Sequence, residues 1–392
     1  MKSFGWGLVL SLFLLACNQP KTIESKIMKI TWDTLAVIPP AQEKTVQLGL
    51  AGPVAGAYQN NLIVAGGSNF EDAMPWQGGT KLYHDRIYVL TQNANNQYDW
   101  WQPDEKLPVP LAYSACVSNG KGVLSIGGET AEGPVKRVFM ISVDGEKIRI
   151  TDYPHLPIGL TSAGAAQKGS VVYLAGGLDL AGATSHFFAL DLAAVDSGWK
   201  ALPDLPVPLS HAVVACQFDG QEDCVFVLGG RNKSGITSTF LSDIWKFVPS
   251  KNKWQQAGKL QVEGDEVFGF SAGTGLAVGE HGILLFGGDR GNIFNQTERL
   301  IDAAAKAETA DEREKIQQQK AENLTNHPGF SRDVYLFNTL TGKLSRIGAL
   351  DGLAQVTTNA FWWDQQIIIP GGEIRPGVRS AVITRGIISL DE

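Results

Sequence analysis

The chain has 392 residues, of which 19% are charged, and it carries a formal net charge of −7. An acidic chain without a basic cluster does not suit the phosphate backbone, so nucleic acid is excluded as a partner. Length alone would allow two or three domains, but one repeated unit runs through residues 29–392. We therefore predict a single domain there.

The first segment is a predicted export signal. Lys2 precedes an apolar run, Leu8 to Ala16, that is too short to span a membrane. The run ends in Leu-Leu-Ala-Cys17, which resembles the lipobox of bacterial lipoproteins. We expect a lipoprotein signal peptide at 1–17, lipidation at Cys17 and a tether at 18–28. The protein would then be exported and anchored in the periplasm or at the outer membrane, touching membrane only through this lipid. The alternative is an ordinary signal peptide with an incidental cysteine.

Six β-forming runs, spaced about 50 residues apart, each end in a glycine pair. Most pairs are followed by an aromatic strand, then a Trp or a substitute, then a Leu-Pro step. This pattern resembles the kelch type of β-propeller repeat. One pair of strands cannot bury its own apolar face, so the repeats must close into a ring. The sequence thus predicts an all-β, six-bladed kelch-type β-propeller. The glycine pairs are Gly66-Gly67, Gly127-Gly128, Gly176-Gly177, Gly229-Gly230, Gly287-Gly288 and Gly371-Gly372.

The sixth repeat lacks an outer strand. After Gly372 the chain offers one more β-forming run, at 381–384, and then a short tail. The missing strand has its counterpart at 29–35, where Trp32 and Leu35 precede Pro39-Pro40. We expect this N-terminal strand to complete the last blade and remove the exposed sheet edges.

One stretch, residues 297–326, breaks the β pattern. It is rich in Ala, Glu, Lys, Arg and Gln, which favour helix. We predict a helical insertion of two helices in the fifth blade. It serves either as a surface decoration or as a lid over the site.

Three cysteines remain in the mature chain: Cys116, Cys216 and Cys224. Their odd number and spacing do not indicate a metal site or a catalytic thiol, so we expect buried structural cysteines. Cys216 and Cys224 flank a hairpin tip, which leaves a disulfide between them as the alternative. The six histidines also lack ligand-like spacing, and no metal is expected.

Each glycine pair should end the second strand of its blade, so the following loops emerge on one face close to the axis. The first residues of these loops are unusually charged for turns, and their convergence predicts a ligand pocket. They are Ser68, Glu129, Leu178, Arg231, Asp289 and Glu373.

The sixth loop carries the most distinctive motif, Gly-Gly-Glu373-Ile-Arg375-Pro-Gly-Val-Arg379. It resembles the Gly-Glu-x-x-Pro-Gly-x-Arg motif of the bacterial N-acetylneuraminate epimerases, the sialic acid mutarotases, which are six-bladed kelch propellers. In that family the Glu and Arg of this motif are the proposed catalytic pair. The resemblance therefore implies that Glu373 and Arg379 are catalytic.

The resemblance covers essentially the whole mature chain. Residues 127–133 are similar to the family's Gly-Gly-Glu-Thr-Ala-Gly-Gly segment, residues 292–295 to its Asn-Ile-Phe-Asn, and residues 66–81 to a loop of its cyclically permuted branch. The order differs, because here the catalytic motif comes last rather than mid-chain. A closed ring tolerates such permutation, since each blade keeps its neighbours.

The resemblance implies an isomerase that interconverts the anomers of sialic acid, a small sugar acid, without a cofactor. Glu373 would act as acid and base, and Arg379 as carboxylate anchor or electrostatic stabiliser. With the loop positions, it points to a substrate-binding set of Asn69, Lys81, Glu129, Arg231, Asp289, Asn292 and Asn295.

Three other functions compete with this one. A non-enzymatic, surface-anchored kelch module would bind a glycan or a protein, and the fold alone does not exclude it. A sialidase would carry Ser-x-Asp-x-Gly-x-x-Trp boxes, which we do not find. A kelch copper oxidase would need a Tyr/His/Cys ligand set, whereas Tyr113 and His211 occupy matching places in two repeats, as packing residues do. No pattern indicates an oligomeric state.

Overall fold

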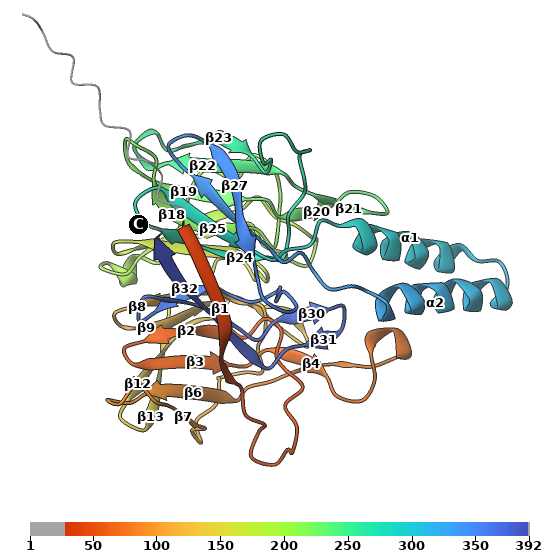
Figure 1. The fold of residues 1–392 in the computed structure, drawn as a ribbon, viewed down its shortest axis with the longest axis horizontal. Coiled ribbons are helices and arrows are strands. Elements are labelled where there is room, and N and C mark those ends of the chain that lie inside the picture. Colours follow the sequence, from red (N-terminus) through yellow and green to blue (C-terminus); the bar gives the residue numbers. More distant parts are fainter. Residues whose placement is uncertain (1–27, 391–392) are drawn as a thin grey trace, which may run out of the picture.

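The computed structural model describes residues 28–390, which form a six-bladed propeller (Figure 1). Each blade is a four-stranded antiparallel sheet. The first three blades are β2 (Val54–Tyr58), β3 (Asn61–Ala65), β6 (Ile87–Gln92), β7 (Tyr98–Trp101); β8 (Ala115–Asn119), β9 (Gly122–Ile126), β12 (Val138–Asp144), β13 (Lys147–Tyr153); and β14 (Gly164–Lys168), β15 (Val171–Ala175), β16 (Phe187–Asp191), β17 (Lys200–Ala201). The other three are β18 (Val213–Phe218), β19 (Asp223–Leu228), β22 (Asp243–Val248), β23 (Lys253–Lys259); β24 (Thr274–Val278), β25 (Gly282–Phe286), β26 (Asp333–Asn338), β27 (Lys343–Ala349); and β28 (Phe361–Trp363), β29 (Gln366–Pro370), β32 (Val382–Leu390), β1 (Met28–Val37).

The N-terminal strand closes the ring. β1 pairs antiparallel with β32, from Met28 opposite Leu390 to Val37 opposite Val382. Trp32 also packs edge-on against Phe286 of the fifth blade, with ring centroids 5.4 Å apart. The expected closure of the sixth blade is confirmed. The expected signal peptide, Cys17 and residues 18–27 of the tether lie outside the described residues, and Met28 already belongs to β1.

Both glycines of every pair have a positive φ, 62° to 68° at the first and 87° to 105° at the second. A side chain would be strained in this conformation, which explains why the pair recurs in each blade. Space is short as well, because a Cβ at Gly229 would lie 2.3 Å from the carbonyl oxygen of Phe270.

A closed circle of backbone hydrogen bonds surrounds the propeller axis. One residue just before each inner strand has φ between 51° and 60° and donates its N–H to the equivalent residue of the preceding blade, at 2.7 to 3.0 Å. The residue before each of these forms a β-bridge with the first residue after a glycine pair. All six loops therefore lie on one face, which we call the mouth face. The members of the circle are Gly52, Tyr113, Ser162, His211, Ala272 and Thr357.

The apolar core lies between neighbouring blades. One cluster joins Val213 and Phe226 of the fourth blade to Ile283 and Phe337 of the fifth. The two cysteines of the β18–β19 hairpin lie in different clusters, since Cys216 is opposite Val225 while Cys224 is opposite Gln217. Adjacent register positions point to opposite faces of a sheet, so these cysteines cannot form a disulfide.

The helical insertion consists of two helices, α1 (Asn292–Lys306) and α2 (Ala310–Thr325). They lie side by side and stand out from the mouth face (Figure 1). The predicted start at residue 297 is wrong, because α1 already begins at Asn292. Gly291, with φ of 89°, ends the preceding loop, and its carbonyl accepts from the N–H of Asn295 at 2.8 Å. Neither helix is long and apolar enough to cross a membrane.

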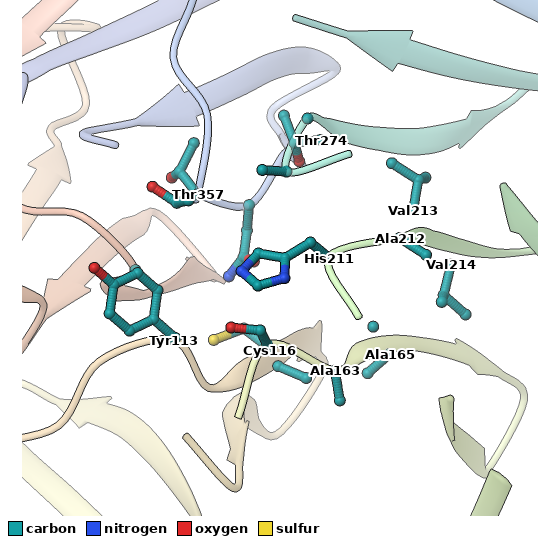
Figure 2. Close-up of a pocket in the computed structure, with 18 of the residues that line it drawn as sticks. Tyr113, Cys116, Ala163, Ala165, His211, Ala212, Val213, Val214, Thr274 and Thr357 are labelled. Atoms are coloured by element: carbon teal, nitrogen blue, oxygen red, sulfur yellow. The ribbon is translucent and has the colours of Figure 1, made fainter. Parts of the chain in front are cut away.

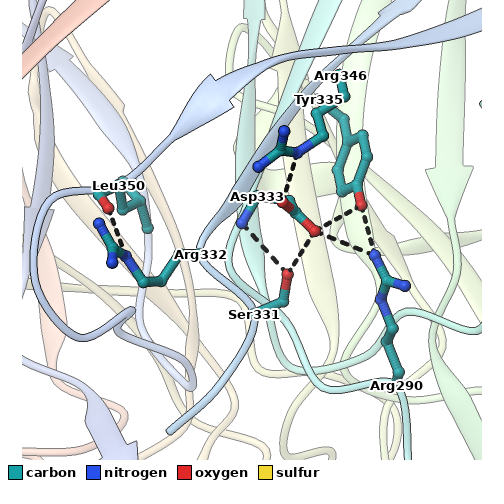
Figure 3. Close-up of polar contacts among 7 residues, drawn as sticks. All are labelled: Arg290, Ser331, Arg332, Asp333, Tyr335, Arg346 and Leu350. Atoms are coloured by element: carbon teal, nitrogen blue, oxygen red, sulfur yellow. Dashed lines mark hydrogen bonds and ion pairs between the residues drawn. The ribbon is translucent and has the colours of Figure 1, made fainter.

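The two ends of the insertion are joined at its base. Arg290, just before α1, lies 3.1 Å from the carboxylate of Asp333 and 2.6 Å from the Tyr335 hydroxyl (Figure 3). Asp333 also accepts from Ser331 at 3.1 Å and from Arg346 at 2.6 Å. This network holds the residue before α1 against the start of β26, so the insertion does not disturb the fifth blade.

Short hairpins and 3-10 turns complete the structure. Four of the loops after glycine pairs form two-stranded hairpins on the mouth face. They are β4 (Ser68–Phe70) with β5 (Lys81–Tyr83), β10 (Glu129–Thr130) with β11 (Gly133–Pro134), β20 (Arg231–Lys233) with β21 (Ser238–Phe240), and β30 (Glu373–Arg375) with β31 (Val378–Arg379). The 3-10 turns are η1 (Pro75–Gln77), η2 (Val195–Ser197) and η3 (Pro249–Lys251).

Candidate active site

The β30–β31 hairpin brings Glu373 and Arg379 together. The two residues are cross-strand partners, and Arg379 Nη1 lies 2.7 Å from Glu373 Oε1. Gly377, with φ of 76°, forms the turn between them and donates its N–H to the same oxygen at 2.7 Å. Only 5% of the Arg379 side chain and 19% of the Glu373 side chain are exposed. Arg375 is exposed, as its place in the turn predicts.

Further contacts hold Arg379 in place. Its Nε donates to the carbonyl oxygen of Ser68 at 3.4 Å, and its guanidinium stacks on Phe70 at 4.9 Å from the ring centroid. Two donors of the guanidinium are thus used within the protein. In the described part of the chain, the Oε2 of Glu373 has no such partner. One carboxylate oxygen is fixed, and the other is available to a ligand.

Asn69 does not reach the site. In β4 the side chains alternate, so Ser68 and Phe70 share one face and Asn69 points to the other. Asn69 is buried, donates to the carbonyl oxygen of Gly49 at 3.2 Å and contacts His84 at 2.8 Å. The prediction that Asn69 binds substrate is therefore wrong. It braces the hairpin from behind.

Lys81 and Glu129 form a second ion pair on the mouth face. Lys81 Nζ lies 2.8 Å from Glu129 Oε1, which also accepts from the Tyr83 hydroxyl at 2.6 Å. Burial and this hydrogen bond raise the pKa of Tyr83 to about 12. Burial opposes the charge on Lys81, but Tyr113, Glu129 and Tyr83 outweigh it and raise the pKa of the ammonium. The pair joins the first blade to the second.

Arg231 enters the site from the fourth blade. Its guanidinium stacks on Phe294 of α1 at 4.5 Å and lies 6.0 Å from the ring of Phe240, its cross-strand partner. Asp289 occupies the equivalent ring position in the fifth blade, and its carboxylate accepts from the N–H of Gly291 at 2.8 Å. The loops that carry these residues emerge on one face, as predicted, while a pocket shared by all of them stays a prediction.

The first turn of α1 carries Asn292 and Asn295. Asn292 is exposed, whereas the Oδ1 of Asn295 is buried without a hydrogen-bond partner among the described residues. An unsatisfied buried acceptor of this kind suits a ligand-binding role for Asn295 better than for Asn292.

Sequence reasoning missed His327, which follows α2. It is buried, and its Nδ1 accepts from the N–H of Gly329 at 3.0 Å, so the proton of the neutral ring is on Nε2. Burial lowers its pKa, although Asp289 and Glu373 are near enough to oppose this. No motif marks His327, since the insertion brings it to the mouth.

A small pocket lies where the inner ends of the six blades meet (Figure 2). Its cavity of about 130 Å³ is lined mainly by small residues of the inner strands, and the ring of His211 points into the middle of them, with Tyr113 to one side (Figure 2). The Tyr113 hydroxyl lies 2.9 Å from Ser68 Oγ, so Tyr113 belongs to the site rather than only to the packing. Burial and the charge of Arg231 hold the pKa of His211 well below its usual range, and its Nδ1 lies 2.9 Å from Ser210 Oγ.

The fold and the site define a six-bladed β-propeller with a carboxylate–guanidinium pair at the mouth of its axis. The family model described as N-acetylneuraminate epimerase matches residues 15–150 and 153–392. The chain therefore belongs to the N-acetylneuraminate epimerase family.

Individual relatives are more distant. The chain is 26% identical over 249 residues to the N-acetylneuraminate epimerase of Salmonella typhimurium, a match that covers 62% of this chain and 60% of that protein. It is 33% identical over 131 residues to the Vibrio vulnificus protein of the same name, covering 31% and 33% of the two chains. Among solved structures, that titled "Structure of YjhT" is similar in fold, with a TM-score of 0.57 and 14% identity over 90% of this chain and 99% of that one.

Proposed function

We propose that the protein interconverts the α and β anomers of N-acetylneuraminate. The observation that carries this proposal is the state of Glu373, whose Oε1 is held by Arg379 and Gly377 while Oε2 has no partner among the described residues. A carboxylate that is held at one oxygen by a buried guanidinium and is open at the other is suited to accept a proton from a bound sugar. Family membership supports the choice of sugar.

Anomer exchange requires only proton transfers and one reversible bond cleavage. Oε2 of Glu373 removes the proton of the anomeric hydroxyl, the carbonyl forms, and the bond from the anomeric carbon to the ring oxygen breaks. The ring oxygen takes a proton, which Glu373 can return. Rotation exposes the other face of the carbonyl, and Glu373 removes the proton of the ring hydroxyl as its oxygen attacks the carbonyl carbon. Glu373 then returns this proton to the former carbonyl oxygen, which becomes the anomeric hydroxyl of the other anomer. General acid–base assistance of this kind contributes about 10²–10⁴-fold.

Proton NMR tests the proposal. Exchange between the two anomers of N-acetylneuraminate is measured with wild-type protein, with Glu373→Gln and without protein. We expect wild type to accelerate exchange and the variant to lose most of that acceleration. Saturable sugar binding with unchanged exchange would instead identify a glycan-binding module. If the protein neither binds the sugar nor accelerates its exchange, the sugar is rejected as the ligand.

We also propose that the protein is exported and lipid-anchored through Cys17. Support comes from the sequence of residues 1–17 alone. Metabolic labelling with a fatty acid, with Cys17→Ala as the matched control, is the test. We expect label on wild type only, and unlabelled wild type would remove the anchor.

A further inference from the structure

Arg231 is a half-buried cation at the mouth whose side chain has no ionic partner among the described residues. Lys81 is paired with Glu129, and Arg379 with Glu373, each at less than 3 Å. For Arg231 the structure shows neither an ion pair nor a hydrogen bond from the guanidinium. Its contacts there are the rings of Phe294 and Phe240.

The carboxylates nearest to Arg231 are all engaged elsewhere. Glu373 is bound to Arg379, and Asp289 accepts from its own loop through the N–H of Gly291. Glu298 of α1 is paired with Lys233 at 2.9 Å and accepts from the N–H of Ser238 at 2.6 Å. Their negative charges favour the charged form of Arg231, while burial lowers its pKa. The guanidinium of Arg231 is therefore attracted to the nearby carboxylates but forms an ion pair with none of them.

The stacking of Arg231 leaves its hydrogen-bonding edge free. The guanidinium carbon lies over the ring of Phe294, 4.5 Å from its centroid, and the two phenyl rings meet edge to face at 5.6 Å. A guanidinium donates in its own plane, so a stacked arginine can still bind a carboxylate bidentately. Arg231 is only half-buried, but leaving a partly desolvated cation unpaired still has a cost, which an anionic ligand reduces.

We propose that Arg231 binds the carboxylate of the substrate, and that Arg379 orients Glu373. This assignment rests on the proposed function, in which the substrate is a 2-keto sugar acid. The carboxylate and the anomeric hydroxyl of such a sugar are attached to the same carbon. Arg231 and Glu373 face the mouth from the fourth and sixth blades, so one can hold the carboxylate while the other reaches the hydroxyl. Binding of the substrate carboxylate and proton transfer at the anomeric hydroxyl are thereby assigned to different residues.

The helical insertion also contributes to this carboxylate site. α1 supplies Phe294, which supports the guanidinium, and Glu298, which ties the β20–β21 hairpin to the helix. Gly291 permits this contact, because a Cβ there would lie 2.4 Å from the ring of Phe240. The base of the insertion thus forms one wall of the carboxylate site.

The test compares N-acetylneuraminate with its methyl ester, which keeps the sugar but lacks the negative charge. Affinities of both are measured by NMR titration for wild type, Arg231→Gln and Arg231→Lys. Arg375→Gln is the matched control, since it removes one exposed positive charge from the same face. Melting temperatures are recorded on the same samples.

We expect wild type to bind the acid about 10- to 100-fold more tightly than the ester. Arg231→Gln should bring this ratio close to one, Arg231→Lys should restore only part of it, and Arg375→Gln should leave it unchanged. If wild type binds the acid and its methyl ester about equally, the proposal is overturned before any variant is measured. A ratio that survives in folded Arg231→Gln also overturns it and assigns the carboxylate to another cation. Unaccelerated exchange by wild type contradicts the proposed function instead, while the binding ratio still tests Arg231.

Discussion

The Nε of Arg379 donates to the carbonyl oxygen of Ser68, a residue 311 positions earlier in the chain. This bond joins the β30–β31 hairpin of the last blade to the β4–β5 hairpin of the first. The candidate catalytic pair is therefore fixed across the seam at which the propeller closes. Local sequence places Glu373 beside Arg379, but ring closure determines the orientation of both.

Replacing Glu373 by Gln removes the proton acceptor and keeps the shape of the side chain. We expect catalysed anomer exchange to fall by about 10²-fold or more, with the fold intact. Exchange by NMR and melting temperature on one sample check this. Glu280→Gln is a suitable control, because Glu280 is 89% exposed and lies in the turn between β24 and β25. Undiminished exchange in a stable Glu373→Gln protein would end the hypothesis.

Replacing Arg379 by Lys keeps the charge but loses the planar fork. A lysine cannot hold Glu373, donate to the Ser68 carbonyl and stack on Phe70 together. We expect kcat to fall about 10-fold or more, since Glu373 loses its orientation. KM should change less if Arg231 anchors the carboxylate. Steady-state exchange rates at several sugar concentrations separate the two parameters, and a change confined to KM would contradict the orienting role.

Replacing Asp333 by Asn should destabilise the base of the insertion by about 1–3 kcal/mol, because Arg290 and Arg346 lose charge-assisted partners. Burial opposes the charge on Asp333, but Arg346, Tyr335 and Ser331 outweigh it and lower its pKa below the usual 3.8. Its stabilising contribution is therefore present above pH 3.8 and is lost as the pH falls through the lowered value. Urea unfolding of wild type and variant from pH 7 down to below the lowered pKa of Asp333 measures it. A difference in stability that does not shrink at low pH would show that the charge is unimportant.

Replacing residues 300–322 by a short Gly-Ser linker should leave the propeller folded, because Arg290 and Asp333 still join the ends of the insertion. The remaining turns of α1 lose α2 and are too short to be stable alone. We expect weaker binding of the sugar acid, since Phe294 no longer supports Arg231. Circular dichroism and NMR titration check both points. Unchanged affinity would make the insertion a surface decoration.

Deleting residues 27–40 removes β1 and exposes the edge of β32. We expect an aggregating or unfolded product, because an open sheet edge pairs with other chains. A chain that starts at residue 27 is the control and should stay monodisperse in size-exclusion chromatography and retain exchange activity. A soluble, active product of the longer deletion would show that closure by β1 is dispensable.

The sequence by itself determined the blades, their number and the manner of closure. Two successive residues with positive φ favour a glycine pair, so the same pair recurs in the sequence of each blade. The outer strand missing after residue 384 and present at 29–35 indicated how the ring closes. The pairing of Glu373 with Arg379 was also predictable, since the Pro376-Gly377 turn is local.

Only the tertiary structure decided which side chains meet in the mouth. Asn69 points away because of its register in β4, and Cys216 and Cys224 diverge for the same reason. Arg231 has no ionic partner among the described residues, because its neighbouring carboxylates are engaged by Arg379, by the N–H of Gly291 and by Lys233. Backbone conformation depends on adjacent residues and restricts the residue types at each position, so it can be predicted from the sequence. Contacts between blades, such as Arg379 with Ser68 and Lys81 with Glu129, are fixed only once the ring has closed.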